Sequence, residues 1–139
     1  MADPAIVPVS PPLRKIETPP IDDALFEEIT HKIVEAFHPR RVILFGSRAR
    51  GDYHEDSDVD IMVEMETDDI PLVRRQKVGR LFLNRWWSMD LLVYTPEEVE
   101  ARKNSTYFII PEILREGRVL YDRGNGRSET GVTELQVYR

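Results

Sequence analysis

Residues 41–64 of this 139-residue chain read RVILFGSRARGDYHEDSDVDIMVE. After Arg41 the sequence is β-branched, apolar and aromatic, which predicts a buried strand that stops at Gly46. Residues 58–64 alternate polar and apolar side chains, which predicts a second strand with one polar face. Because successive side chains of a strand point to opposite faces, Asp58 and Asp60 share that polar face. A glycine turn after one strand and two carboxylates on the next strand therefore decide the fold.

A helix is predicted before this segment, because apolar residues recur at every fourth position: Leu25, Ile29, Ile33 and Phe37. Asp22 or Asp23 would cap its start, and His38-Pro39 would end it, since the residue before proline avoids the helical conformation.

Further elements are predicted after the second strand. Residues 71–85 indicate a surface helix with a basic side, and residues 89–94 indicate a third strand. A helix capped by Thr95 would run to about Lys103, a further helix would span residues 107–116, and a last strand would cover residues 118–121. This order predicts an α+β (α/β layered) fold, with a short mixed β-sheet covered by helices on one face.

The bulk composition supports one folded domain. Six of the ten prolines fall in residues 1–20, which predicts an extended leader, followed by a domain over residues 21–123 and a flexible tail over residues 124–139. The chain has no cysteine, no secretory signal pattern and no transmembrane run, so we expect a cytoplasmic protein. A net charge of −6 argues against direct nucleic-acid binding.

Asp58 and Asp60 form the first candidate site. Unpaired, the two carboxylates would repel each other, whereas a divalent cation between them removes the conflict. Oxygen ligands, with no cysteine and no histidine at ligand spacing, favour Mg²⁺ or Mn²⁺ over zinc. If the strand that contains Asp90 pairs beside the second strand, its carboxylate joins the other two. Three acids could then hold two metal ions about 3.5–4 Å apart, which suits nucleotidyl transfer.

Gly46 and Ser47 are the candidate phosphate ligands. A glycine after a strand lets the backbone approach a ligand, and a following helical turn directs free N–H groups at phosphate. Arg48 and Arg50 either assist with their charge or pair with loop acids. Arg48 is assigned to the nucleotide-binding set with Gly46 and Ser47, and for Arg50 both alternatives stay open.

The segment FGSRARG over residues 45–51, six further residues and the Asp-Val-Asp of residues 58–60 resemble the signature of the DNA polymerase beta-like nucleotidyltransferase superfamily. That signature is Gly-Ser, ten residues and Asp-x-Asp. The small size and the GSRARG sequence resemble the minimal nucleotidyltransferases, MntA-like antitoxins usually paired with a HEPN-domain ribonuclease toxin. The resemblance covers roughly residues 22–122 and implies metal-binding acids at Asp58, Asp60 and Asp90. It also implies ATP as substrate, phosphate binding by Gly46 and Ser47, and a heteromeric complex with a HEPN toxin.

Three functions follow from the motif and the resemblance. The leading one is Mg²⁺-dependent transfer of AMP from ATP to a hydroxyl, namely a tyrosine of a partner HEPN toxin, by an antitoxin. In this hypothesis Asp58 and Asp60 bind both ions, and Asp90 completes one site and accepts the proton of the hydroxyl. The second is nucleotidyl transfer to a small molecule or an RNA end. The third is an antitoxin that masks its toxin by binding, without catalysis.

Whether Trp86, Trp87 and the basic helix form an interface is left open by the sequence.

Overall fold

The computed structural model describes residues 18–125, so most of the predicted leader, and all of the predicted tail except Gly124 and Asn125, lie outside the described residues. The elements follow one another as α1 (Asp23–Phe37), β1 (Arg41–Phe45), α2 (Ser47–Arg50), β2 (Val59–Glu64), α3 (Pro71–Gly79), the 3-10 turn η1 (Arg80–Phe82), β3 (Met89–Tyr94), α4 (Pro96–Arg102), α5 (Ile110–Glu116), β4 (Arg118–Asp122) and the 3-10 turn η2 (Arg123–Asn125). Among the helices of residues 18–125, none combines the length and the apolar composition that a membrane crossing requires.

Helix α1 begins and ends where its sequence predicts. The side chain of Asp22 accepts a hydrogen bond of 3.2 Å from the N–H of Leu25, which satisfies a free donor of the first turn. At the other end His38 adopts a left-handed conformation with φ 50°, and its N–H donates to the carbonyl of Val34. The buried face of α1 then packs on the sheet through residues such as Ile29 and Ile33.

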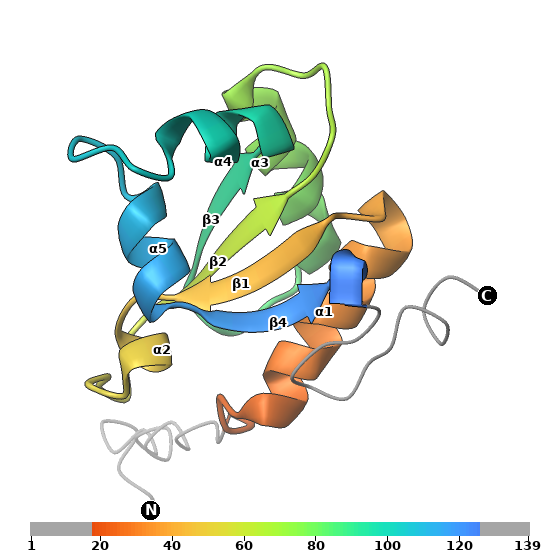
Figure 1. The fold of residues 1–139 in the computed structure, drawn as a ribbon. Helices are drawn as coiled ribbons and strands as arrows, with labels where there is room; N and C mark the ends of the chain where they lie inside the picture. Colours follow the sequence, from red (N-terminus) through yellow and green to blue (C-terminus); the bar gives the residue numbers. More distant parts are fainter. Residues whose placement is uncertain (1–17, 126–139) are drawn as a thin grey trace, which may run out of the picture.

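The four strands form one mixed sheet in the order β3-β2-β1-β4 (Figure 1). Strand β1 pairs antiparallel with β2 and β4, whereas β2 pairs parallel with β3, and α3 lies in the crossover that a parallel pair requires. Phe45 lies opposite Asp60 in one pairing, and Asp60 lies opposite Asp90 in the other. This register brings the Gly46 turn and the carboxylates of two strands to one end of the sheet.

The two faces of the sheet carry hydrophobic clusters of different size. The larger cluster lies under α1 and α3, and the smaller one joins Ile43, Phe45 and Met62 to Ile113 of α5. The predicted α+β class with a mixed sheet is confirmed. The prediction also placed the helices on one face of the sheet. Helices α1 and α3 cover the face with the larger cluster, but α5 packs on the opposite face (Figure 1).

Two predicted helices differ in detail from the observed ones. The basic helix ends at Gly79 and continues as a 3-10 turn, and α5 begins at Ile110 rather than at Tyr107. Arg74 does not belong to a solvated basic side. It is 7% exposed, and its Nη1 donates to Glu98 Oε1 at 2.6 Å. Glu98 also completes the predicted capping box with Thr95, so Arg74 ties α3 to the start of α4.

Candidate active site

Asp60 and Asp90 are direct neighbours across the parallel β2–β3 pair. Both side chains lie on the face of the sheet that α5 covers, because Met62 of the same strand face belongs to the α5 cluster. Together with Gly46 and Arg50 they line a cavity of about 260 Å³. This cavity is closed by Ile109, the residue before α5, and by three residues of α5: Glu112, Ile113 and Glu116. The strand pairing on which the Asp90 prediction depended is therefore present.

Gly46 joins β1 to α2 in a conformation that requires glycine. Its φ is +74°, and a Cβ atom at this position would lie 2.1 Å from Oδ2 of Asp60. The carbonyl of Gly46 accepts hydrogen bonds from the N–H groups of Ala49 and Arg50, so the short helix α2 starts directly at the turn. The first N–H groups of any helix have no hydrogen-bond partner within that helix. In α2 these are the N–H groups of Ser47 and Arg48. The turn therefore lies against the Asp60 carboxylate at Gly46, and the first N–H groups of α2 follow it directly in the chain.

Arg48 is directed at the protein's own loop. Its Nε donates to the carbonyl of Ser57 at 3.0 Å, and its Nη2 donates to the carbonyls of Glu55 at 3.1 Å and His54 at 3.4 Å. The guanidinium also lies over the ring of Tyr53 at 4.8 Å from the centroid. Arg48 does not line the cavity that holds Asp60 and Asp90, so its assignment to nucleotide binding stays a prediction, and its contacts show that it holds the loop leading to β2.

Arg50 is the arginine that faces the candidate site. It lines the cavity, and its positive charge acts on Asp60. Its Nε lies 3.3 Å from Asp52 Oδ1, and its Nη1 lies 3.9 Å from Glu116 Oε2. Both ion pairs are partly exposed, so they leave the guanidinium able to exchange partners. The sequence left two alternatives open for Arg50, and the structure shows both. Arg50 pairs with the loop acid Asp52, and its charge also lies at the cavity that holds Asp60.

The Asp60 carboxyl is the most perturbed acid of the site. Burial raises its pKa to about 6, and the negative charges of Asp90 and Asp58 act in the same direction, while Arg50 opposes them. A raised pKa at a carboxylate cluster is the electrostatic conflict that a bound divalent cation would relieve. The charges of the two exposed acids Asp58 and Asp90 thus both act on the partly buried carboxyl of Asp60.

The donor chemistry of these acids fits Mg²⁺ or Mn²⁺, because all three offer hard carboxylate oxygens. Within residues 18–125, however, no group of three or more His, Cys, Asp or Glu side chains is close enough together to hold a metal ion. The structure therefore shows a neighbouring pair with a third acid near it, and coordination of Mg²⁺ by Asp58, Asp60 and Asp90 stays a proposal.

The contribution of α5 was not predicted. Ile109, Glu112 and Glu116 reach the cavity only because β4 pairs with β1 and brings the preceding helix over Phe45. No local signal in the sequence marks that pairing. The sequence left open whether Trp87 belongs to an interface. In the structure Trp87 packs against the larger cluster and contacts the ring of Phe82 edge-on.

A mixed sheet with a glycine turn facing neighbouring carboxylates is the arrangement of an enzyme that transfers phosphoryl or nucleotidyl groups. Residues 27–125 match the family described as "Polymerase beta, Nucleotidyltransferase". The chain belongs to this family and is a nucleotidyltransferase.

Individual relatives agree with this assignment. The chain is 34% identical over 82 residues to a "Putative protein adenylyltransferase" of Methanocaldococcus jannaschii, covering 59% of this chain and 78% of that protein. A second protein of the same name and organism is 45% identical over 56 residues, covering 38% of this chain and 52% of its own length. A crystal structure described as a "putative nucleotidyltransferase" from Sulfolobus solfataricus aligns with a TM-score of 0.54 and 25% identity, covering 73% of this chain and 81% of that one.

Proposed function

We propose that this protein transfers AMP from ATP to a hydroxyl group of a protein, releasing pyrophosphate. The observation that carries the proposal is the pairing of Asp60 with Asp90 on adjacent parallel strands, opposite the Gly46 turn and in one cavity. The names of the two Methanocaldococcus relatives support a protein as the acceptor. The GSRARG sequence favours, more narrowly, a tyrosine of a HEPN toxin and hence an antitoxin role.

The reaction forms one bond and breaks another. The acceptor oxygen attacks the α-phosphorus of ATP, the bond between the α-phosphorus and the bridging oxygen breaks, and pyrophosphate leaves. The hydroxyl proton passes to a carboxylate oxygen of Asp90, which is exposed and therefore accessible to an acceptor. Main-chain N–H groups of Ser47 and Arg48, with the Ser47 hydroxyl, hold phosphate oxygens.

The side chain of Arg50 would then change its partner. A triphosphate beside Gly46 would compete with Glu116 for Arg50, because charge-assisted bonds to phosphate are stronger than an ion pair of 3.9 Å. Bound Mg²⁺, held by Asp58, Asp60 and Asp90, would supply neutralisation of the charge on the phosphates. The carboxylates of Asp60 on β2 and Asp90 on β3 would therefore lie beside the phosphates that the Gly46 turn holds.

The experiment incubates the protein with Mg²⁺, ATP labelled at the α-phosphate and the product of the neighbouring gene. We expect labelled AMP on the partner protein, lost in the Asp58→Ala/Asp60→Ala variant. Label on a small molecule or an RNA end in place of protein would establish the second hypothesis. Tight binding and neutralisation of a toxin by the double variant, without label in either sample, would establish the masking antitoxin.

A further inference from the structure

One edge of the sheet is open beside Asp90. Strand β3 is an edge strand, and its main-chain groups alternate between β2 and the outside. The N–H of Val59 donates to the carbonyl of Ser88 at 2.8 Å, and the N–H of Met65 donates to the carbonyl of Tyr94 at 2.9 Å. Even-numbered residues of β3 therefore bond to β2. The odd-numbered residues Met89, Leu91 and Val93 direct their main-chain groups outward.

The open part of this edge is short and well placed. The carbonyl of Val93 accepts a bond of 3.4 Å from Nη1 of Arg74, so that end is covered. Across residues 18–125, no main-chain group bonds to the outward side of Met89 or Leu91. An uncovered strand edge is a template for pairing with an extended peptide. The two free residues lie on either side of Asp90.

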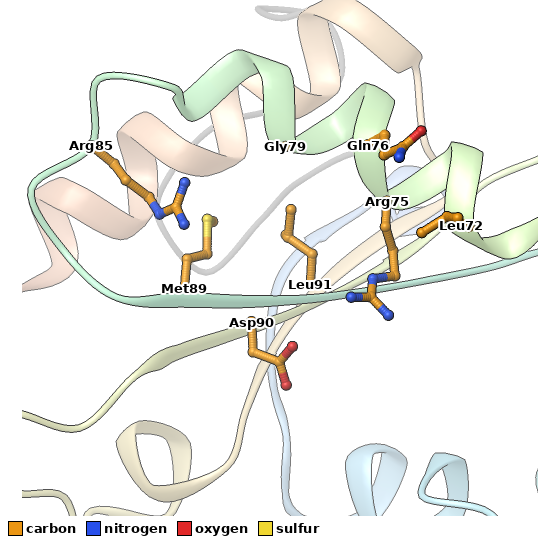
Figure 2. A pocket seen from close by; sticks show the side chains of 8 residues that line it. All are labelled: Leu72, Arg75, Gln76, Gly79, Arg85, Met89, Asp90 and Leu91. Atoms are coloured by element: carbon orange, nitrogen blue, oxygen red, sulfur yellow. The ribbon is translucent and has the colours of Figure 1, made fainter.

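A groove of about 210 Å³ runs along this edge, between α3 and β3 (Figure 2). Met89 and Leu91 point toward α3, whereas Asp90 points to the other side of the strand (Figure 2). Asp90 lines both this groove and the cavity that holds Asp60 and Gly46. The groove and the candidate active site therefore lie on either side of one strand and share Asp90 as a lining residue.

Two arginines line the groove, and its one acidic lining residue, Asp90, points to the other side of the strand (Figure 2). Arg75 and Arg85 lie toward opposite ends of it (Figure 2), and both are exposed. In the described part of the chain neither forms an ion pair, whereas Arg74 and Lys77 of the same helix pair with Glu98 and Asp69. Two unpaired guanidinium groups on a chain of net charge −6 favour an acidic ligand.

We propose that the β3 edge receives an extended segment of the acceptor protein that carries acidic residues around the modified hydroxyl. This rests on the proposed function, because it names the class of its protein substrate. The segment pairs with Met89 and Leu91 as a fifth strand. Since side chains alternate, the residue beside Asp90 points to the active-site face, and its neighbours point toward Arg75 and Arg85.

The first test measures binding by fluorescence anisotropy. The probes are nine-residue labelled peptides with one central tyrosine, flanked either by glutamates or by lysines. We expect the glutamate peptide to bind about tenfold more tightly, and Arg75→Glu/Arg85→Glu to reverse the preference. The control is Arg40→Glu, which changes an exposed arginine at the opposite end of the sheet and should leave both affinities within about twofold. Equal binding of the two peptides, or no binding of either, would overturn the proposal.

The second test asks for strand pairing. N-methylation of alternate residues removes the N–H groups on one side of an extended peptide only. We expect one of the two alternating N-methyl sets to weaken binding at least about tenfold, while the other set retains it. Equal loss from both sets, or loss from neither, contradicts addition to the β3 edge.

A third arm separates this proposal from the proposed function and from other ligands. The arginine variants should bind a fluorescent ATP analogue as the wild type does. A loss of ATP affinity with unchanged peptide affinity would make the groove part of the nucleotide site. Tighter binding of single-stranded RNA than of the glutamate peptide would make it a nucleic-acid surface, and both results overturn the proposal. Peptide binding as expected without AMP transfer would leave the docking edge standing and refute the proposed function.

Discussion

A Cβ atom on Gly46 would lie 2.1 Å from Oδ2 of Asp60. The turn after β1 and the middle carboxylate of the site are thus packed against each other with no room for a methyl group. A loop that holds phosphate through its main chain must come this close to the acids that act on the same phosphate. Gly46 therefore fixes the distance between the two halves of the site.

Gly46→Ala should displace Asp60 and reduce AMP transfer by about 100-fold, since a shift of about 1 Å at a reacting centre costs that much. The matched control is Gly51→Ala. Gly51 has φ +95°, but a Cβ atom there would meet no other atom within 4 Å, so this variant reports backbone strain alone. Gly51→Ala should lose roughly 1–2 kcal/mol of stability from backbone strain. Gly46→Ala should lose more, because the clash with Asp60 adds to the strain, and only Gly46→Ala should lose activity. Equal activity of the two variants would show that the contact with Asp60 has no functional role.

Asp60 predicts a pH dependence of stability in metal-free buffer. Its pKa in the folded chain is about 6, above the ordinary value of 3.8, so between these values the folded state binds more protons than the unfolded state. Stability should therefore fall as the pH rises from about 4 to about 6. Asp60→Asn should remove this fall and stabilise the protein at pH 8 by ~1 kcal/mol, a value reduced because the carboxylate is partly exposed to solvent. Urea unfolding of the wild type and of Asp60→Asn between pH 4 and pH 8 measures this difference in unfolding free energy.

The control for this titration is Asp56→Asn, which removes an exposed loop acid outside the cavity. Its pH profile should follow that of the wild type. An Asp60→Asn profile that also follows the wild type would place the perturbed carboxyl elsewhere.

Mg²⁺ should offset the loss of stability that the ionised carboxylate of Asp60 causes at high pH. If Asp58 and Asp60 hold the ion, it binds the folded chain and stabilises it by about 2.7 kcal/mol at 100 times its dissociation constant. We expect Mg²⁺ to raise the Tm of the wild type at pH 8 and to leave the Asp58→Asn/Asp60→Asn variant unchanged. A similar Tm increase in both proteins would mean that the ion binds away from these acids.

The sequence predicted the central part of the fold because the signals there are local. The strand predicted over residues 58–64, the glycine after Phe45 and the capping box of Thr95 and Glu98 each depend on residues close in the chain, and the structure confirms the strand from Val59 onward, the glycine turn and the capping box. The predicted polar face of that strand is wrong beyond Asp60, because α5 packs on this face and Met62 and Glu64 are buried. The approach of Glu116 to Arg50 could not be predicted, because it depends on β4 returning to pair with β1. Arg48 shows the same limit, since sequence alone does not tell whether a loop arginine faces the ligand or its own loop.

Arg48→Ala should loosen the loop over residues 51–57. The guanidinium donates to three main-chain carbonyls and lies over Tyr53, and Arg48→Lys should not restore these contacts because lysine lacks the planar fork of donors. We expect a stability loss of about 1–2 kcal/mol in both variants and faster amide hydrogen exchange in the loop. A large loss of ATP affinity without faster exchange would instead support the predicted role of Arg48 in nucleotide binding.

Arg74 and Lys77 offer a comparison of a buried and an exposed ion pair on one helix. Each nitrogen lies 2.6 Å from a carboxylate oxygen, but the Arg74 side chain is 9% exposed and the Lys77 side chain is 47% exposed. Arg74→Met should cost about 3 kcal/mol, because it leaves Glu98 without its partner and breaks the link to α4. Lys77→Met should cost less than about 1 kcal/mol.

The Arg74 effect should also depend on pH. Partial burial opposes ionisation of Glu98, but hydrogen bonds from Thr95 and Arg74, together with the charge of Arg74, bring its pKa below the ordinary value of 4.5. A lowered carboxyl pKa contributes stability above the unfolded-state pKa and loses it as the pH falls through the folded-state value. The difference in unfolding free energy between wild type and Arg74→Met should therefore shrink in acid, while that of Lys77→Met stays small throughout. A difference that is the same at pH 7 and in acid would show that Arg74 acts by packing its side chain rather than by its charge.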